Sequence, residues 1–192
     1  MKQNFFKIVL TGPESSGKTT LAAALATALD TVYVPEFARI YLENLGRPYI
    51  RDDLSLIAAG QLELEQHYAP LARRYLVCDT DWTVIQVWDY YRFRFSGLEY
   101  TGLGVEGWTQ IGLGGIPDFA PVPLPDSGVF YFLCAPDFPW QPDPLREHPE
   151  ERHILFGLYE RLLQNLDLPY VVLRGTEANR LEQATAIILS LP

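Results

Sequence analysis

A glycine-bounded loop between an apolar strand and a helix constrains this chain more than any other feature. Residues 5–11 form a β-rich apolar run, and Leu21, Leu25 and Leu29 follow the loop at helical spacing. The loop reads Gly12-Pro13-Glu14-Ser15-Ser16-Gly17-Lys18-Thr19. It matches the pattern G-x-x-x-x-G-K-[ST], in the strand, loop and helix setting that this pattern requires. The sequence therefore predicts a phosphate-binding loop, or P-loop.

Each part of this loop has a physical role in holding a chain of phosphates. Gly12 and Gly17 let consecutive backbone N–H groups point inward, because side chains there would obstruct the curve. The helix N-terminus adds about half a positive charge. We expect Lys18 to contact the β and γ phosphates and the Thr19 hydroxyl to bind Mg²⁺. The predicted ATP-binding residues are Gly12, Pro13, Glu14, Ser15, Ser16, Gly17, Lys18, Thr19 and Thr20.

Strand-like and helix-like segments alternate along the rest of the chain. Strands are expected at 31–34, 75–78, 128–133 and 170–173, and helices at 37–45, from Asp52 or Asp53 to about 68, 81–95, 150–166 and 177–189. This alternation predicts an α/β fold with three layers, α/β/α, around a mostly parallel five-stranded sheet. With the P-loop it indicates a P-loop NTPase of the nucleoside- and nucleotide-kinase kind. We expect one domain over residues 1–192, and residues 96–127, interrupted by Gly and Pro, are assigned no element.

The charge balance excludes partners that depend on a basic surface. The chain carries 24 acidic and 15 basic residues, for a formal net charge of −9. Nucleic acid and anionic membranes are therefore not expected partners. No stretch approaches the roughly 20 apolar residues of a membrane span, and no signal peptide precedes the first strand, so a cytoplasmic protein is expected. The sequence leaves a homo-oligomer open.

Two carboxylates follow the third expected strand. Asp79 ends the apolar run from Tyr75, where P-loop proteins hold the acidic partner of their magnesium site. We predict that Asp79 is this partner, or the base for a substrate hydroxyl, and that Asp81 contacts the substrate. Aspartates at such positions also serve as turn residues or helix caps, so that reading stays open.

A proline-broken loop at about 136–153 resembles the lid of a kinase. It contains Arg146 and Arg152, whose forked guanidinium groups suit phosphoryl oxygens. We predict that both arginines are catalytic. The alternative is that they are surface charges paired with neighbouring glutamates. Arg180, in the last expected helix, is predicted to be a solvated surface residue, and the alternative is a position over the adenine of ATP.

Five short motifs together resemble the ribosylnicotinamide kinase domain of the bifunctional NadR-type proteins. They are the P-loop, Val34–Arg39, Gly60-Gln61, Cys78–Asp81 and the segment containing Pro139-Trp140, Asp143 and Leu145-Arg146. The resemblance covers nearly the whole chain. It implies transfer of the γ-phosphoryl group of ATP, with Mg²⁺, to the ribose 5′-hydroxyl of nicotinamide riboside, giving nicotinamide mononucleotide. It also implies that Glu36 and Arg39 hold the riboside, that Asp79 lies next to its reacting hydroxyl, and that Trp140 is near its ring.

The chain departs from the bifunctional pattern. It has no H-x-G-H signature, because His67, His148 and His153 lack that spacing, so adenylyl transfer is not expected. It begins at the kinase strand, and we therefore expect a stand-alone kinase without a DNA-binding segment. Two other functions remain open: a nucleotide kinase of the thymidylate kinase type, and a module that senses ATP or NAD without turnover. A GTP switch is disfavoured because no lysine lies in an N-K-x-D motif.

Overall fold

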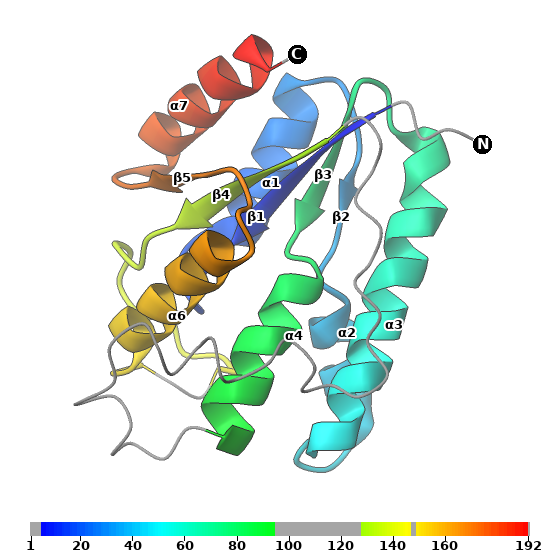
Figure 1. The fold of residues 1–192 in the computed structure, drawn as a ribbon, viewed down its shortest axis with the longest axis vertical. Coiled ribbons are helices and arrows are strands. Elements are labelled where there is room, and N and C mark those ends of the chain that lie inside the picture. Colours follow the sequence, from blue (N-terminus) through cyan, green and yellow to red (C-terminus); the bar gives the residue numbers. More distant parts are fainter. Residues whose placement is uncertain (1–4, 95–127, 147–148, 192) are drawn as a thin grey trace.

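A five-stranded parallel sheet forms the centre of the computed structural model, which describes residues 5–94, 128–146 and 149–191 (Figure 1). Its strands are β1 (Phe6–Thr11), β2 (Tyr33–Val34), β3 (Tyr75–Asp79), β4 (Val129–Cys134) and β5 (Tyr170–Leu173). They are arranged in the order β2-β3-β1-β4-β5, and every neighbouring pair is parallel. The expected α/β fold with a five-stranded sheet is confirmed.

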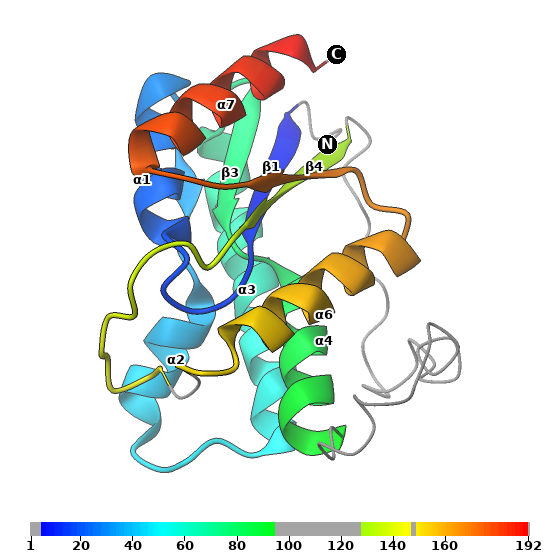
Figure 2. The same cartoon turned by 90° about the vertical axis from the view of Figure 1, so that its left-hand side faces the viewer.

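Helices cover both faces of the sheet (Figure 2). One face packs against α1 (Lys18–Ala28) and α7 (Glu177–Ser190), and the other against α3 (Arg51–Tyr68), α4 (Trp82–Trp88) and α6 (Arg152–Asn165). The short helix α2 (Phe37–Leu45) packs on α3. Coverage on both faces explains why the strands read as continuous apolar runs instead of alternating patterns.

The observed helices lie where they were predicted, and most differ from the prediction by only one or two residues at their ends. The helix expected at 81–95 is α-helical only to Trp88 and continues as a π-helix over Asp89–Arg94. A 3₁₀ turn, Ala69–Leu71, follows α3. The segment 96–127, to which no element was assigned, lies outside the described residues. Among the residues that are described, no helix is long and apolar enough to cross a membrane.

The parallel arrangement brings the carboxyl ends of all five strands to one edge. The P-loop follows β1, Glu36 follows β2, Asp79 ends β3, and the segment beginning at Ala135 follows β4. In parallel α/β sheets ligands bind at this edge. The fold therefore gathers at one edge the segments in which most of the predicted site residues occur.

Candidate active site

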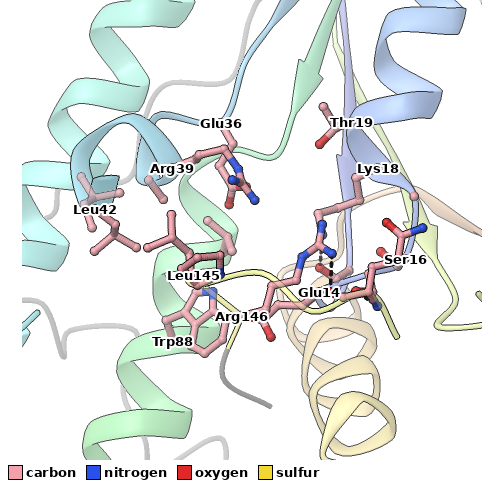
Figure 3. Close-up of a pocket in the computed structure, with 18 of the residues that line it drawn as sticks. Glu14, Ser16, Lys18, Thr19, Glu36, Arg39, Leu42, Trp88, Leu145 and Arg146 are labelled. Atoms are coloured by element: carbon pink, nitrogen blue, oxygen red, sulfur yellow. Dashed lines mark hydrogen bonds between the residues drawn. The ribbon is translucent and has the colours of Figure 1, made fainter. Parts of the chain in front are cut away.

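A cavity of about 480 Å³ opens at the carboxyl edge of the sheet. Its walls come from the P-loop, from α2, from α4 and from the segment after β4. Figure 3 shows Glu36 and Arg39 on one side of this cavity, with Lys18 and Thr19 across from them. Of the nine predicted ATP-binding residues, all except the buried Pro13 line the cavity.

The backbone of the P-loop has the conformation that its glycines were expected to permit. Gly12 has a φ of 133°, and a Cβ there would lie 2.6 Å from the carbonyl oxygen of Cys134. Gly17 has a φ of 79° and begins α1. The Lys18 ammonium group lies across the loop and donates to the carbonyl oxygens of Gly12 and Pro13, each at 2.8 Å. The positive charge of Lys18 is thus held by two carbonyl oxygens at the start of the curved loop.

Asp79 lies directly behind Thr19 and does not itself line the cavity. The residue is 2% exposed, and the Thr19 hydroxyl donates to its carboxylate. Burial raises the Asp79 pKa, while the Lys18 charge and the Thr19 hydrogen bond oppose the rise. Its Oδ1 atom is buried and has no hydrogen-bond partner among the described residues. A carboxylate oxygen left free beside a hydroxyl is a donor set that fits Mg²⁺.

Asp81 has the helix-cap position that the sequence left open as an alternative to a substrate contact. Its carboxylate caps α4 by accepting from the Thr83 backbone N–H at 3.0 Å, and it also accepts from the Tyr131 hydroxyl at 2.8 Å. The Lys7 ammonium group lies 3.4 Å from it and 2.7 Å from Glu65. Asp81 is completely buried and does not line the cavity. The structure thus places Asp81 behind the cavity wall, with its oxygens already bonded.

Glu36 and Arg39 both line the cavity. Burial raises the pKa of Glu36 to about 7, helped by the negative charge of Asp79 and opposed by Lys18 and Arg39. Arg39 donates to Asp143 at 2.8 Å, so it joins α2 to the segment after β4. Glu36 therefore presents a carboxylate that titrates near neutral pH.

The Gly60-Gln61 motif supports the Glu36 segment from α3. The Gln61 side-chain oxygen accepts from the backbone N–H of Phe37 at 2.8 Å, and its amide nitrogen is 3.4 Å from the Pro35 carbonyl oxygen. Gly60 allows the Phe37 ring to approach the helix, because a Cβ at Gly60 would lie 2.1 Å from the ring. Two residues of α3 thus fix the backbone on both sides of Glu36.

The two predicted lid arginines have different positions. Arg146 lines the cavity and donates to the Gln141 carbonyl at 2.7 Å. Arg152 begins α6, donates to the Phe138 carbonyl at 2.9 Å and lies 5.8 Å from the Trp140 ring centre. Neither Arg152 nor Trp140 lines the cavity. Only Arg146 is therefore in position to face a ligand there.

The far end of the cavity is apolar and aromatic, and sequence reasoning missed it. Its lining residues include Leu42, Tyr49, Leu54, Ile57, Ile85, Trp88 and Leu145. Figure 3 shows Trp88, Leu42 and Leu145 grouped there. Arg47 also lines the cavity, with both terminal nitrogens bonded to Asp53 at 2.7 and 2.8 Å. The helical spacing of Ile85 and Trp88 was the one local signal for this wall.

Arg180 is not the surface residue that the sequence predicted. Its side chain is 1% exposed, and its guanidinium group donates to backbone carbonyls of the P-loop and of the segments after β4 and β5. No local sequence pattern distinguishes this arginine from the exposed ones.

Comparisons with known proteins agree with this geometry. The family described as AAA domain matches residues 7–102, which are 96 of the 192 residues. None of the curated proteins matches the chain. Solved structures of NadR in complex with NAD and AMP-PNP, and of NadR in complex with NR, each align with a TM-score of 0.66 at 21% identity. They cover 98% of this chain and 49% and 50% of the NadR chains, so this chain spans about half their length.

A thymidylate kinase from Candida albicans aligns with a TM-score of 0.57 at 18% identity, covering 97% of this chain and 92% of the kinase. At such identities the likenesses show the fold. They confirm the predicted P-loop fold of the nucleoside- and nucleotide-kinase kind.

Proposed function

Because the chain belongs to the AAA domain family of P-loop proteins, we propose that it is an ATP- and Mg²⁺-dependent kinase whose acceptor is a nucleoside. One observation carries this proposal. A single cavity is lined on one side by the P-loop and on the other by the carboxylate of Glu36. A phosphate donor and an acceptor hydroxyl can therefore meet within it.

The donor end has the groups that phosphoryl transfer needs. The P-loop N–H groups and Lys18 bind the phosphates, and Arg146 stabilises the charge on the transferred group. A magnesium ion held by the Thr19 hydroxyl and the Asp79 carboxylate would neutralise charge on the β and γ phosphates. The buried, unpartnered Oδ1 of Asp79 supports this assignment.

Glu36 is the better candidate for the proton acceptor. It lines the cavity, whereas Asp79 lies behind Thr19. A carboxylate with a pKa of about 7 is matched to accepting a hydroxyl proton near neutral pH. In the proposed step the acceptor oxygen forms a bond to the γ-phosphorus, the bond from this phosphorus to ADP breaks, and Glu36 takes the hydroxyl proton.

The acceptor end favours a nucleoside over a nucleotide. Arg39 and Arg47, which could hold an acceptor phosphate, are each paired with a carboxylate, Asp143 and Asp53. The adjoining wall is apolar and aromatic, which suits the ring of a nucleoside. These contacts argue against an acceptor of the thymidylate kinase type.

Within this class we favour nicotinamide riboside, with nicotinamide mononucleotide as the product. The motifs around Glu36, Asp79 and Asp143 resemble those of NadR-type kinase domains, and NadR has been solved with NR bound. A cationic ring can also stack on an aromatic face such as that of Trp88 or Tyr49. The proposed role of the protein is then the salvage of an NAD precursor in the cytoplasm.

The test is ADP release from Mg-ATP with a panel of nucleosides that includes nicotinamide riboside. The panel is run on wild type, Glu36→Gln and Asp79→Asn, with Asp52→Asn, an exposed carboxylate of α3, as the matched control. Riboside-dependent ADP that both site variants abolish and the control retains would support the proposal. Activity with another nucleoside alone would remove the favoured substrate, and ATP binding without turnover would favour a sensing module.

A further inference from the structure

We propose that Arg180 is a positioning residue for ATP, which orients the P-loop without touching the nucleotide; this inference rests on the proposed ATP site. Arg180 lies in the first turns of α7 and does not line the cavity. Its guanidinium nitrogens donate to the carbonyl oxygens of Ser16 at 2.7 Å, Ala135 at 2.8 Å and Gly175 at 3.1 Å. One side chain therefore joins three segments that follow three different strands.

Space filling does not account for this arginine. Its side chain is 1% exposed, and a buried guanidinium group is costly unless its donors are bonded. Its carboxylate partner, Asp137, lies 3.2 Å away and is itself partly exposed. The three hydrogen bonds named above go to backbone carbonyls, so the guanidinium group mainly fixes the backbone at the expected phosphate-binding edge.

The bond to Ser16 has a direct effect on the P-loop. A trans peptide unit is planar, so its C=O and N–H groups point in opposite directions. When Arg180 holds the Ser16 carbonyl, it also fixes the direction of the Gly17 N–H, which belongs to the same peptide unit. Gly17 lines the cavity, and without a side chain its backbone has more conformational freedom than that of other residues. Arg180 thus aims one of the N–H groups that we expect to contact phosphate.

A second contact reinforces the same peptide. The Arg180 guanidinium lies 4.5 Å from the centre of the Phe138 ring. This ring packs on Gly17, where an added Cβ would lie 2.7 Å from its Cε2 atom, and Phe138 also lines the cavity. Arg180, Phe138 and Gly17 therefore pack in succession, and Phe138 and Gly17 line the cavity. Loss of the guanidinium group should therefore weaken both the packing of Phe138 in the cavity wall and the fixed orientation of the peptide between Ser16 and Gly17.

Arg180→Met is therefore expected to weaken ATP binding without changing acceptor binding. If the Gly17 N–H is no longer oriented, one charge-assisted hydrogen bond to phosphate is lost or weakened, and this lowers the affinity for ATP by about 10- to 100-fold. The KM for ATP should rise by that factor while the KM for the acceptor stays within about twofold. Arg180→Lys should recover part of the loss, because a lysine can bond one of the carbonyls but not all three.

The experiment is equilibrium titration with AMP-PNP and Mg²⁺, without acceptor, beside steady-state kinetics. Arg174→Met is the matched control, because Arg174 also approaches Asp137, at 3.5 Å, but is 65% exposed. If Arg180→Met does not fold, Asp137→Asn removes the charge that faces Arg180 and should weaken AMP-PNP binding in the same direction, by less. Folded variants that bind AMP-PNP like wild type, or that change both KM values equally, would overturn the role of Arg180. Wild type that binds AMP-PNP but phosphorylates no nucleoside would instead refute the kinase proposal, and the binding data would still test Arg180.

Discussion

Gly60→Ala should destabilise the protein, although the same change in a helix interior normally stabilises it. Alanine is better than glycine inside a helix by about 0.5 to 1 kcal/mol. At Gly60, however, the new Cβ would lie 2.1 Å from Cε1 and 2.4 Å from Cδ1 of the Phe37 ring. Contacts this short force one of the two groups to move.

The size of the effect follows from what holds Phe37. Its backbone N–H is bonded to Gln61, and its ring packs against the core between α2 and α3. Inserting a methyl group into such packing costs about 1 to 3 kcal/mol. Subtracting the helix preference leaves a net loss of roughly 0.5 to 2 kcal/mol in the free energy of unfolding. Glu36 directly precedes Phe37, so the acceptor KM should rise while the ATP KM stays unchanged.

Gly157→Ala is the control for this prediction. Gly157 lies inside α6, and a Cβ there would meet no atom within 4 Å. It should therefore gain about 0.5 to 1 kcal/mol. Urea unfolding of both variants, with both KM values, makes the comparison. If Gly60→Ala gained as much stability as Gly157→Ala and kept its acceptor KM, the packing of Phe37 on α3 would not position Glu36.

Further variants test two buried charged groups, Lys7 behind the cavity and Glu36 in its wall. Lys7→Met leaves Asp81 and Glu65 buried without a cation, so it should lose about 3 to 5 kcal/mol in urea unfolding, and adding Glu65→Leu should restore part of this. Burial alone would lower the Lys7 pKa, but the charges of Asp81 and Glu65 raise it, so the stability from this lysine should persist to its ordinary pKa of 10.5 and decline only at higher pH. Glu36 also loses stability as pH rises, but at lower pH: its pKa is raised to about 7, first by burial and then by Asp79, so the fold disfavours its charged form. Unfolding of the nucleotide-free protein should therefore show stability lost between about pH 4.5 and 7, by up to about 3 kcal/mol, and Glu36→Gln should flatten this slope; an unchanged slope would contradict the raised pKa.

Local patterns were sufficient for the parts of the fold that depend on neighbouring residues. The P-loop, with Gly12 and Gly17 at its ends, is defined within eight positions, and both glycines have the positive φ that the pattern implies. Apolar runs identified all five strands. The second strand begins two residues later than predicted, at Tyr33, and ends as predicted at Val34, where Pro35 has no N–H to continue the ladder.

The buried charges that the sequence did not identify are polar side chains whose partners lie far away in the sequence. Arg180 and Ser16 are 164 positions apart, and Lys7 and Asp81 are 74 apart. Lysine, aspartate and arginine are usually exposed, so the sequence by itself does not distinguish the buried ones. Only the folded chain reveals that each of these charges has a buried partner. The apolar cavity wall was missed for a similar reason, since Tyr49 and Trp88 come to line one cavity only after α3 and α4 pack together.

These buried contacts share one geometric relation to the cavity. Gln61 bonds the backbone beside Glu36, Arg180 bonds the backbone beside Gly17, and Asp81 caps α4, two residues after Asp79. Each polar group lies one layer behind a group that we assign to the donor, the acceptor or the metal. Hydrogen bonds in a buried setting resist rearrangement more than exposed pairs do, because breaking them leaves a desolvated polar atom. By contrast, the ion pair between α2 and the segment after β4 is formed by Arg39 with a side chain 43% exposed. We therefore expect the sheet edge that we assign to phosphate binding to be the rigid part of the site, and the segment carrying Arg146 to be the part held by weaker, solvent-screened contacts.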